Sequence, residues 1–434
     1  MNNRLERLIG QVDRANFYKF YGKLTQVIGT IVESMGPPAS VGDFCWIYEN
    51  DGNRVPAEVV GFRENRVILM PFKSMSGIQP GNLVLSTGKP LKTGVTKDLL
   101  GRVLDGLGNP IDNKGEIYSE KFVNVVNSPP LPLDRSPITD PMATGVRAID
   151  GLITLGKGQR IGIFAGSGVG KSTVLGMIAR NASADVNVIA LIGERGREVP
   201  EFIHRDLTDE GLKKSVVVAV TSDQPPLLRI KGALTATAIA EYFRDMGLDV
   251  LLMMDSSTRI AMAQREVGLA VGEPPTTRGY TPSVFALLPQ LLERSGTSVN
   301  GSITGIYTVL VEGDDMNDPV ADSMRSILDG HVVLTRALAE RNHYPSIDVL
   351  ASVSRLMTAI ASEEHKRSAS HMRQVLATYR ESEDLINIGA YSVGSNQEID
   401  YALEKIDVIN NFLRQGIFED TNFDDTVDQL VNLF

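Results

Sequence analysis

The chain has 434 residues, of which 42% are hydrophobic, and a formal net charge of −10. The length suggests about two to four domains with large cores, and the acidic balance without a basic stripe argues against nucleic acid as a partner. A single cysteine, Cys45, excludes an internal disulfide framework, and the sequence has neither a long apolar run nor a signal-peptide core. We therefore expect a cytoplasmic protein.

Residues 1–22 are predicted to form an amphipathic N-terminal segment. An apolar stripe at helical spacing is made by Leu5, Leu8, Ile9 and Val12. The spacing alone leaves open whether this helix docks a partner or packs on its own chain.

The composition and hydrophobic pattern of the sequence predict three further domains. Residues 23–92 hold short β-rich runs between Gly, Pro and Asp-Gly turns, which predicts a β-barrel. In residues 93–360, a proline-rich connector leads into apolar strands that alternate with helical patterns, so a mostly parallel α/β sheet is expected. Residues 361–434 are charged and helical and are predicted to form a C-terminal helical domain.

A glycine-rich loop between an apolar strand and a helical run carries the strongest chemical signal. Backbone N–H groups of such a loop surround phosphates, Lys171 can bridge the β- and γ-phosphates, and the Ser172 hydroxyl can ligate Mg²⁺. At the first glycine of the usual pattern this chain has alanine, which fits only if φ is negative there. The predicted nucleotide-binding residues are Ala165, Gly166, Ser167, Gly168, Val169, Gly170, Lys171, Ser172 and Thr173.

Two carboxylates follow apolar strands, at the edge where open α/β sheets bind ligands. Glu194 is a candidate base that orients the water attacking the γ-phosphate, and Asp255 is a candidate Mg²⁺ ligand through its water shell. The alternatives are a surface ion pair of Glu194 with Arg195 or Arg197, and a helix N-cap at Asp255.

Several motifs in order resemble the catalytic subunits of rotary ATPases. They are GRVLDGLG at 101–108, TGVRAIDG at 144–151, the phosphate loop, GER at 193–195 and SVSR at 352–355. The runs GIFAGSGVGKS at 162–172, TSDQPP at 221–226, GEPPTTRGY at 272–280 and DGH at 329–331 look like those of the flagellum-specific export ATPases. The alanine at position 165 is shared by that branch, and the resemblance covers the chain from about residue 20.

The resemblance implies a RecA-like P-loop core and adds roles that spacing could not supply. Arg195 joins the catalytic residues through its motif, and Arg355 matches the arginine finger that enters the neighbouring subunit's site. Tyr344 matches the aromatic residue that stacks on adenine, and Tyr391 falls loosely where a C-terminal aromatic closes the same pocket. Without the resemblance, Arg355 would be interpreted as a surface arginine and Tyr344 as a core tyrosine.

By resemblance, the chain is an ATP hydrolase with ATP and Mg²⁺, assembled as a homohexamer that energises flagellar type III protein export. The implied partners are a stator-like regulator at the N-terminal helix, a central stalk protein, the membrane export gate, and export substrates with their chaperones. The implied location is the inner face of the cell membrane. The alternatives are an injectisome ATPase, a non-catalytic ring subunit, which would usually lack a glutamate at position 194, and a ring-shaped nucleic-acid translocase.

Overall fold

The computed structural model describes residues 19–119, 121–311, 313 and 315–434. The chain divides into two compact units: residues up to Leu91 together with Ala270–Gly272, and the remainder. Most of the expected N-terminal helix lies outside the described residues. Within the described ranges, no helix is both long and apolar enough to cross a membrane.

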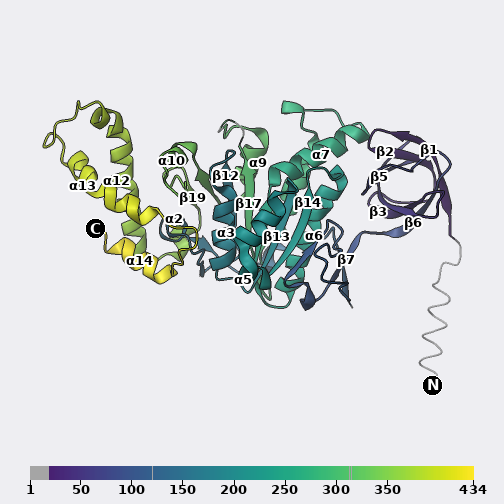
Figure 1. Ribbon diagram of the computed structural model, residues 1–434, viewed down its shortest axis with the longest axis horizontal. Helices are drawn as coiled ribbons and strands as arrows, with labels where there is room; N and C mark the ends of the chain where they lie inside the picture. Colours follow the sequence, from purple (N-terminus) through teal and green to yellow (C-terminus); the bar gives the residue numbers. More distant parts are fainter. Residues whose placement is uncertain (1–18, 120, 312, 314) are drawn as a thin grey trace, which may run out of the picture. The chain divides into compact units, whose positions relative to one another are not determined.

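The first unit holds a closed barrel with strand order β1-β2-β5-β4-β3-β6 (Figure 1). Alternate apolar side chains of these strands point inward, as a barrel requires, and Cys45 is fully buried among them. Burial raises the pKa of the Cys45 thiol to about 11, which keeps it inert as a packed strand residue. The barrel strands are β1 Tyr21–Ile28, β2 Ile31–Met35, β3 Asp43–Tyr48, β4 Arg54–Arg63, β5 Arg66–Pro71 and β6 Leu83–Pro90.

The second unit is built on a sheet that, among the described residues, has nine strands in the order β19-β18-β12-β17-β15-β13-β14-β8, with β16 paired to β17. All pairs are parallel except β18–β19 and β16–β17, so the predicted mostly parallel sheet is confirmed. Its strands are β8 Arg102–Leu104, β12 Arg160–Ala165, β13 Val186–Glu194, β14 Ser215–Thr221, β15 Asp249–Asp255, β16 Gly296–Thr297, β17 Ser302–Leu310, β18 Gly330–Leu334 and β19 Val353–Ser354.

The sheet is buried on both faces, which explains its uninterrupted apolar strands. Ile189 and Leu191 of β13 belong to one apolar cluster with Leu175 and Ile178 of α3, Lys171–Asn181. The next residue, Ile192, faces the other side, where α6, Pro226–Asp245, packs so closely that only glycine fits at position 232. The two helices therefore cover opposite faces of the sheet.

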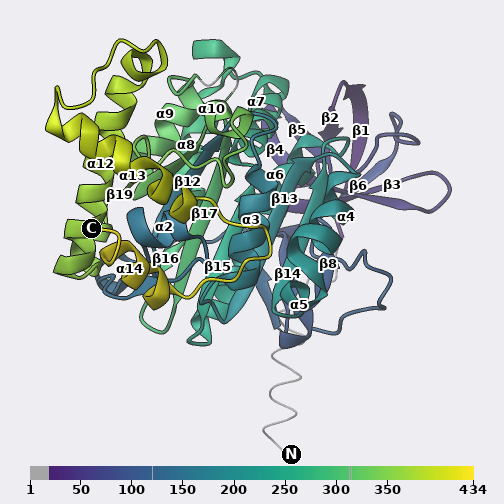
Figure 2. The same ribbon diagram turned by 60° about the vertical axis from the view of Figure 1, so that its left-hand side comes forward.

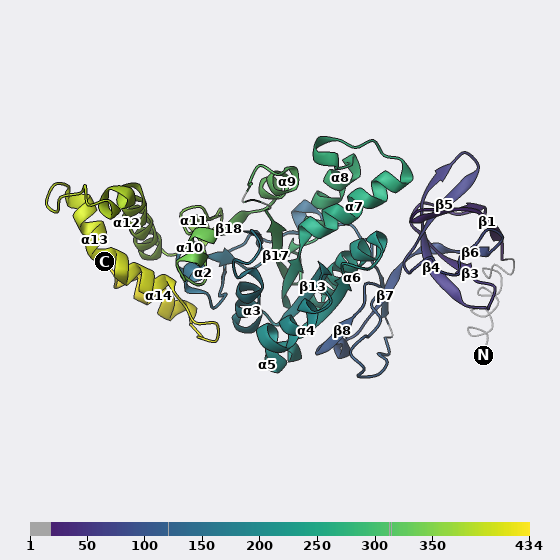
Figure 3. The ribbon, with the colours of Figure 1, turned by 45° about the horizontal axis from the view of Figure 1, so that its top comes forward.

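The C-terminal helices α12, Glu363–Asn387, α13, Gln397–Leu413, and α14, Phe423–Val431, pack on each other and on α2, Arg147–Leu152 (Figure 2, Figure 3). Caps from Ser362, Asn396 and Asn422 start the three helices. The remaining helices are α4 Glu198–Glu201, α5 Thr208–Lys213, α7 Ser257–Val271, α8 Pro282–Leu292, α9 Pro319–Ile327, α10 Arg336–Glu340 and α11 Met357–Ile360. Two small two-stranded sheets pair β7 Lys92–Val95 with β9 Lys121–Asn124, and β10 Pro141–Met142 with β11 Leu155–Gly156.

Candidate nucleotide-binding site

The glycine-rich loop joins β12 to α3, as its sequence context predicts. Gly168 and Gly170 have φ of +80° and +90°, values that favour glycine, and α3 begins at Lys171. Ala165 ends β12 with a non-positive φ and is buried between β17 and β18, so alanine is accommodated without strain. The loop's backbone and the N-terminus of α3 thus form the anion-binding geometry that phosphates require.

Three charged side chains from three elements meet beside this loop. The Lys171 ammonium pairs with the Asp255 carboxylate at the end of β15 and lies 3.7 Å from Glu194 Oε1 at the end of β13. Thr308 of β17 donates its hydroxyl to Asp255 Oδ1 at 2.7 Å, which fixes the carboxylate. Burial by itself disfavours the Lys171 charge, but Asp255 and Glu194 more than offset it and raise its pKa.

Glu194 has an electrostatic environment suited to a base. The pKa of Glu194 is raised to about 7, mainly by burial. The charge of Asp255 and the neighbouring Glu198 carboxyl group also raise the pKa, while the Lys171 charge lowers it. Among the described side-chain atoms, Glu194 Oε1 is buried without a hydrogen-bond partner. A buried carboxylate oxygen without a donor has its acceptor capacity free for a water or a ligand proton.

Lys171 and Glu194 line a cavity of about 810 Å³, a size typical of ligand sites, whereas the buried Asp255 contacts Lys171 without lining the cavity itself. Its lining includes the loop from Ala165 to Gly168 and from Gly170 to Thr173, together with Glu194, Arg195 and Arg197. The Ser172 hydroxyl and the Asp255 carboxylate are the hard oxygen donors that Mg²⁺ prefers. Within the described ranges, no group of three or more His, Cys, Asp or Glu side chains is placed to hold a metal ion.

A second cavity of about 630 Å³ adjoins the first and shares Gly168, Gly170 and Thr173 with it. Tyr344 lines it, close enough that a Cβ at Gly170 would lie 3.6 Å from the tyrosine ring. Residues 414–417, which follow α13, form another part of the wall. The backbone N–H of Gln415 donates to the Tyr344 carbonyl at 3.0 Å, so the two walls are directly joined.

Sequence reasoning missed residues 414–417. They follow the phosphate loop by more than 240 positions and contribute through backbone and turn geometry, for which a single sequence has no motif. The one available signal is Gly416, which comes soon after the end of a helical pattern. It predicts a turn but does not predict that the turn lies beside the phosphate loop.

Two predicted site residues lie away from both cavities. Tyr391 lies in the turn between α12 and α13, where its hydroxyl donates to the Asp400 carboxylate at 2.9 Å, and it does not line either cavity in the described chain. Arg355 follows β19 on the surface, where its guanidinium donates to the Arg325 carbonyl at 3.5 Å. The chain's own fold therefore leaves the Arg355 side chain facing solvent.

Comparison with known proteins agrees with this architecture along most of the chain. The model of the ATP synthase alpha/beta family nucleotide-binding domain matches residues 145–354, and that of the family's beta-barrel domain matches residues 24–88. The model of the T3SS EscN ATPase C-terminal domain matches residues 361–432. Barrel, sheet and C-terminal helices thus define a nucleotide-binding protein of the ATP synthase alpha/beta type.

Relatives that match along almost the whole chain identify the branch of this family to which the chain is most similar. The flagellum-specific ATP synthase of Bacillus subtilis is 54% identical over 99% of both chains, and the type 3 secretion system ATPase of Xanthomonas euvesicatoria is 51% identical over 95% of this chain and 94% of its own. The solved structure of the assembled ATPase EscN from the enteropathogenic E. coli type III secretion system aligns with a TM-score of 0.90 at 49% identity, covering 95% of this chain and 99% of that one. The chain belongs to the ATP synthase alpha/beta family, in the branch of flagellar and type III secretion ATPases, and it is an ATPase.

Proposed function

We propose that ATP binds across the two adjoining cavities. The triphosphate lies along residues 165–173, and adenine lies against Tyr344 and the 414–417 wall. The shared glycines support this placement, because a single bound molecule can extend from one cavity into the other past the start of α3. Ser172 and Asp255 would hold Mg²⁺ beside the phosphates, and the ion would supply charge neutralisation there.

Hydrolysis is carried by the Glu194 carboxylate. The observation that supports this role is a buried oxygen without a hydrogen-bond partner on a group whose pKa is raised to about 7 by burial. A carboxylate with that pKa accepts a proton from the attacking water more readily than an ordinary glutamate does. Lys171 stays charged and binds the phosphates, and Arg195 lines the same cavity and adds positive charge.

Two variants separate binding from chemistry. Lys171→Ala removes the ammonium that meets the ground-state phosphates, so ATP affinity should be lost. Glu194→Gln keeps the shape and removes only the base, so ATP should bind normally while steady-state phosphate release falls by about 10²-fold or more. Near wild-type turnover in Glu194→Gln would remove Glu194 from the base role.

Arg195→Gln tests the role of the Arg195 charge. This variant should lower kcat with little change in ATP affinity.

The biological role that we propose is energising flagellar type III protein export as a ring of six copies. The relatives include flagellum-specific ATP synthases, and EscN has been solved assembled and in complex with its central stalk EscO, the latter aligning with a TM-score of 0.88. A ring would bring Arg355 of one copy to the nucleotide of its neighbour. An injectisome role is the second candidate, because a type 3 secretion system ATPase matches almost as well.

The proposed partners follow from this role. They are a central stalk protein, the membrane export gate, export substrates with their chaperones, and a stator-like regulator at residues 1–22, all at the cytoplasmic face of the membrane. Deletion of the gene distinguishes the two systems. Loss of flagellar filaments supports the flagellar role, whereas intact filaments with lost secretion of other proteins support the injectisome role.

A further inference from the structure

The wall of the proposed adenine cavity is a short non-helical connection, which we call the α13–α14 connector, residues 414–422. Gln415 and Gly416 line the cavity, and the Gln415 side chain is held by the Gly145 carbonyl at 2.7 Å. The Thr421 hydroxyl donates to the same carbonyl at 3.1 Å. Because the connection lacks the internal hydrogen bonds of a helix, its position depends on the neighbouring groups that hold it.

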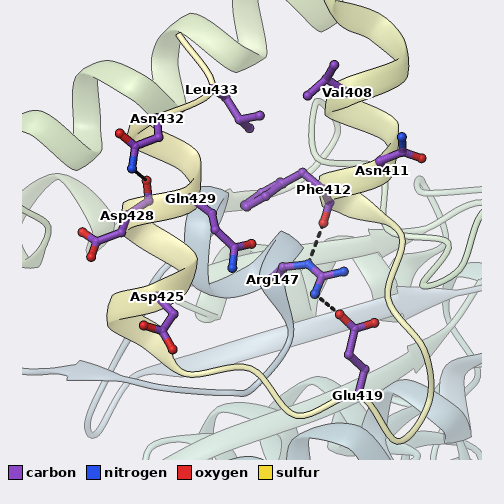
Figure 4. Close-up of a pocket in the computed structure, with 10 residues that line it drawn as sticks. All are labelled: Arg147, Val408, Asn411, Phe412, Glu419, Asp425, Asp428, Gln429, Asn432 and Leu433. Carbon is purple, nitrogen blue, oxygen red and sulfur yellow. Dashed lines mark hydrogen bonds and ion pairs between the residues drawn. The ribbon is translucent and has the colours of Figure 1, made fainter.

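Arg147, at the start of α2, holds the beginning of this connector (Figure 4). Its Nε donates to the Phe412 carbonyl at 2.8 Å, another guanidinium nitrogen donates to the Arg414 carbonyl, and a third pairs with Glu419. The carbonyl of Phe412 belongs to the last turn of α13, where a cation also interacts favourably with the helix dipole. Arg147 is only 8% exposed, so its charge depends on these partners.

Arg180, in the last turn of α3, holds the middle of the same connector. Its guanidinium donates to the carbonyls of Ile417 and Asp206, and it lies over the Phe418 ring at 4.9 Å from the centroid. The first turn of α3 carries Lys171, and the helix is 11 residues long. One rigid helix therefore contacts the proposed phosphate end at its start and the wall of the base cavity at its end.

We propose that Arg147 and Arg180 are positioning residues that fix the α13–α14 connector and thereby set the affinity for the base of the nucleotide. This inference rests on the proposed placement of adenine against Tyr344. Within the connector, Arg147 donates to the Arg414 carbonyl and Arg180 to the Ile417 carbonyl. Neither arginine lines the base cavity, so each acts on the position of the connector. Loosening the connector should weaken binding of the base and leave the phosphate site intact.

The test uses the full-length chain with Arg147→Lys and Arg180→Lys. Lysine keeps the charge but cannot span several acceptors with a planar fork. We expect the dissociation constant of ADP and the KM for ATP to rise about 10-fold, with kcat nearly unchanged. Inhibition by inorganic tripolyphosphate, which has no base, should change by less than about 2-fold.

Two controls make the outcome decisive. Arg294→Lys removes another buried arginine, which pairs with Glu241 at 2.8 Å and lines neither cavity, so it reports the cost of general destabilisation. Tyr344→Ala reports whether the base occupies this cavity at all. If Arg147→Lys fails to fold, Arg180→Lys, at a more exposed site, carries the test.

The outcomes separate the two proposals. The inference is supported if Arg147→Lys and Arg180→Lys weaken ADP binding but not tripolyphosphate binding, while Arg294→Lys leaves ADP binding unchanged. The inference is overturned if the arginine variants weaken ADP and tripolyphosphate equally, or if Arg294→Lys weakens ADP binding as much as they do. It is also overturned if the arginine variants bind ADP normally while Tyr344→Ala weakens ADP binding. Unchanged ADP affinity in Tyr344→Ala overturns the placement of adenine itself, and the inference with it.

Discussion

The Glu194 carboxylate lies near two further carboxylates and one ammonium at the end of β13. Asp255 and Glu198 make ionisation of Glu194 unfavourable, Lys171 favours it, and burial is the largest influence. The alternative of a surface ion pair with Arg195 does not describe this chain, since Arg195 lies 3.7 Å from Glu198 instead. Burial is the main cause of the raised pKa, and Glu194 is buried because it is the last residue of β13. The position at which β13 ends therefore determines the base strength of Glu194.

This environment predicts the pH dependence of the reaction. Glu194 must be deprotonated to act as a base, and its pKa is raised to about 7, so kcat/KM should fall as pH decreases through about 7. Glu198→Gln removes a neighbouring negative charge and should move this acidic limb to lower pH. The measurement is kcat/KM from about 1.5 pH units below that pKa to about 2 units above it. A flat profile in the wild-type chain would contradict the assignment.

The alanine at position 165 gives a second prediction at this scale. Ala165 has an ordinary strand conformation and is 2% exposed, so Ala165→Gly should leave the KM for ATP unchanged. It should lower the free energy of unfolding by roughly 0.5–1 kcal/mol, because glycine gains more freedom in the unfolded chain. Urea unfolding and steady-state kinetics on the same preparation check both parts.

Gly170→Ala is the matched contrast on the same loop. Gly170 has φ of +90°, and its added Cβ would lie 3.6 Å from the Tyr344 ring, so this alanine strains the backbone between the two cavities. The KM for ATP should rise. If Ala165→Gly and Gly170→Ala had the same KM for ATP, the conformation of the loop would not control ATP binding.

At the level of secondary structure, strand–loop–helix units could be predicted wherever apolar runs end in glycine or a carboxylate. Lys171, Glu194 and Asp255 come together because parallel strands end at one edge of the sheet, a rule that needs no tertiary information. Their boundaries are less predictable: Glu194 is the last residue of β13 and not the start of a loop. The edge strand β8 was also missed, because three residues are too few for a periodic pattern.

The residues that fix the base cavity could not be predicted. Residues 414–417 and the two arginines that hold them interact through backbone carbonyls, and a carbonyl is the same in every residue. Tyr344 was found by resemblance alone. Tyr391, the looser match, is bonded to Asp400 and lines neither cavity of the described chain.

The N-terminal segment provides a prediction at the level of elements. The described residues that line the two cavities all lie between positions 165 and 417. Deleting residues 1–18 should therefore leave the dissociation constant for ATP unchanged while abolishing capture of the stator-like regulator. A pulldown and an ATPase assay on the truncated chain measure both. Retained capture would exclude a docking role, and hydrolysis lost at high protein concentration would assign the segment to ring assembly.

For the whole molecule, the position of Arg355 is the main argument for assembly. Its side chain is exposed and donates to the carbonyl of Arg325, a residue that lines neither cavity of the described chain. An arginine that stabilises transition-state charge must reach the γ-phosphate, so the role that we propose for Arg355 requires a neighbouring copy. Turnover should accordingly rise more steeply than linearly with protein concentration.

Mixing two inactive variants tests this arrangement directly. Arg355→Ala should bind ATP normally and lose turnover, and Lys171→Ala should lose binding but keep an intact Arg355. In rings formed at random from equal amounts, about a quarter of the interfaces pair an intact phosphate loop with an intact Arg355. Phosphate release should therefore recover partly on mixing, because each restored interface is a complete site. Mixing Arg355→Ala with Glu194→Gln is the matched second pair and should recover similarly. A chain with full specific activity at dilutions where it is monomeric would contradict a site completed in trans.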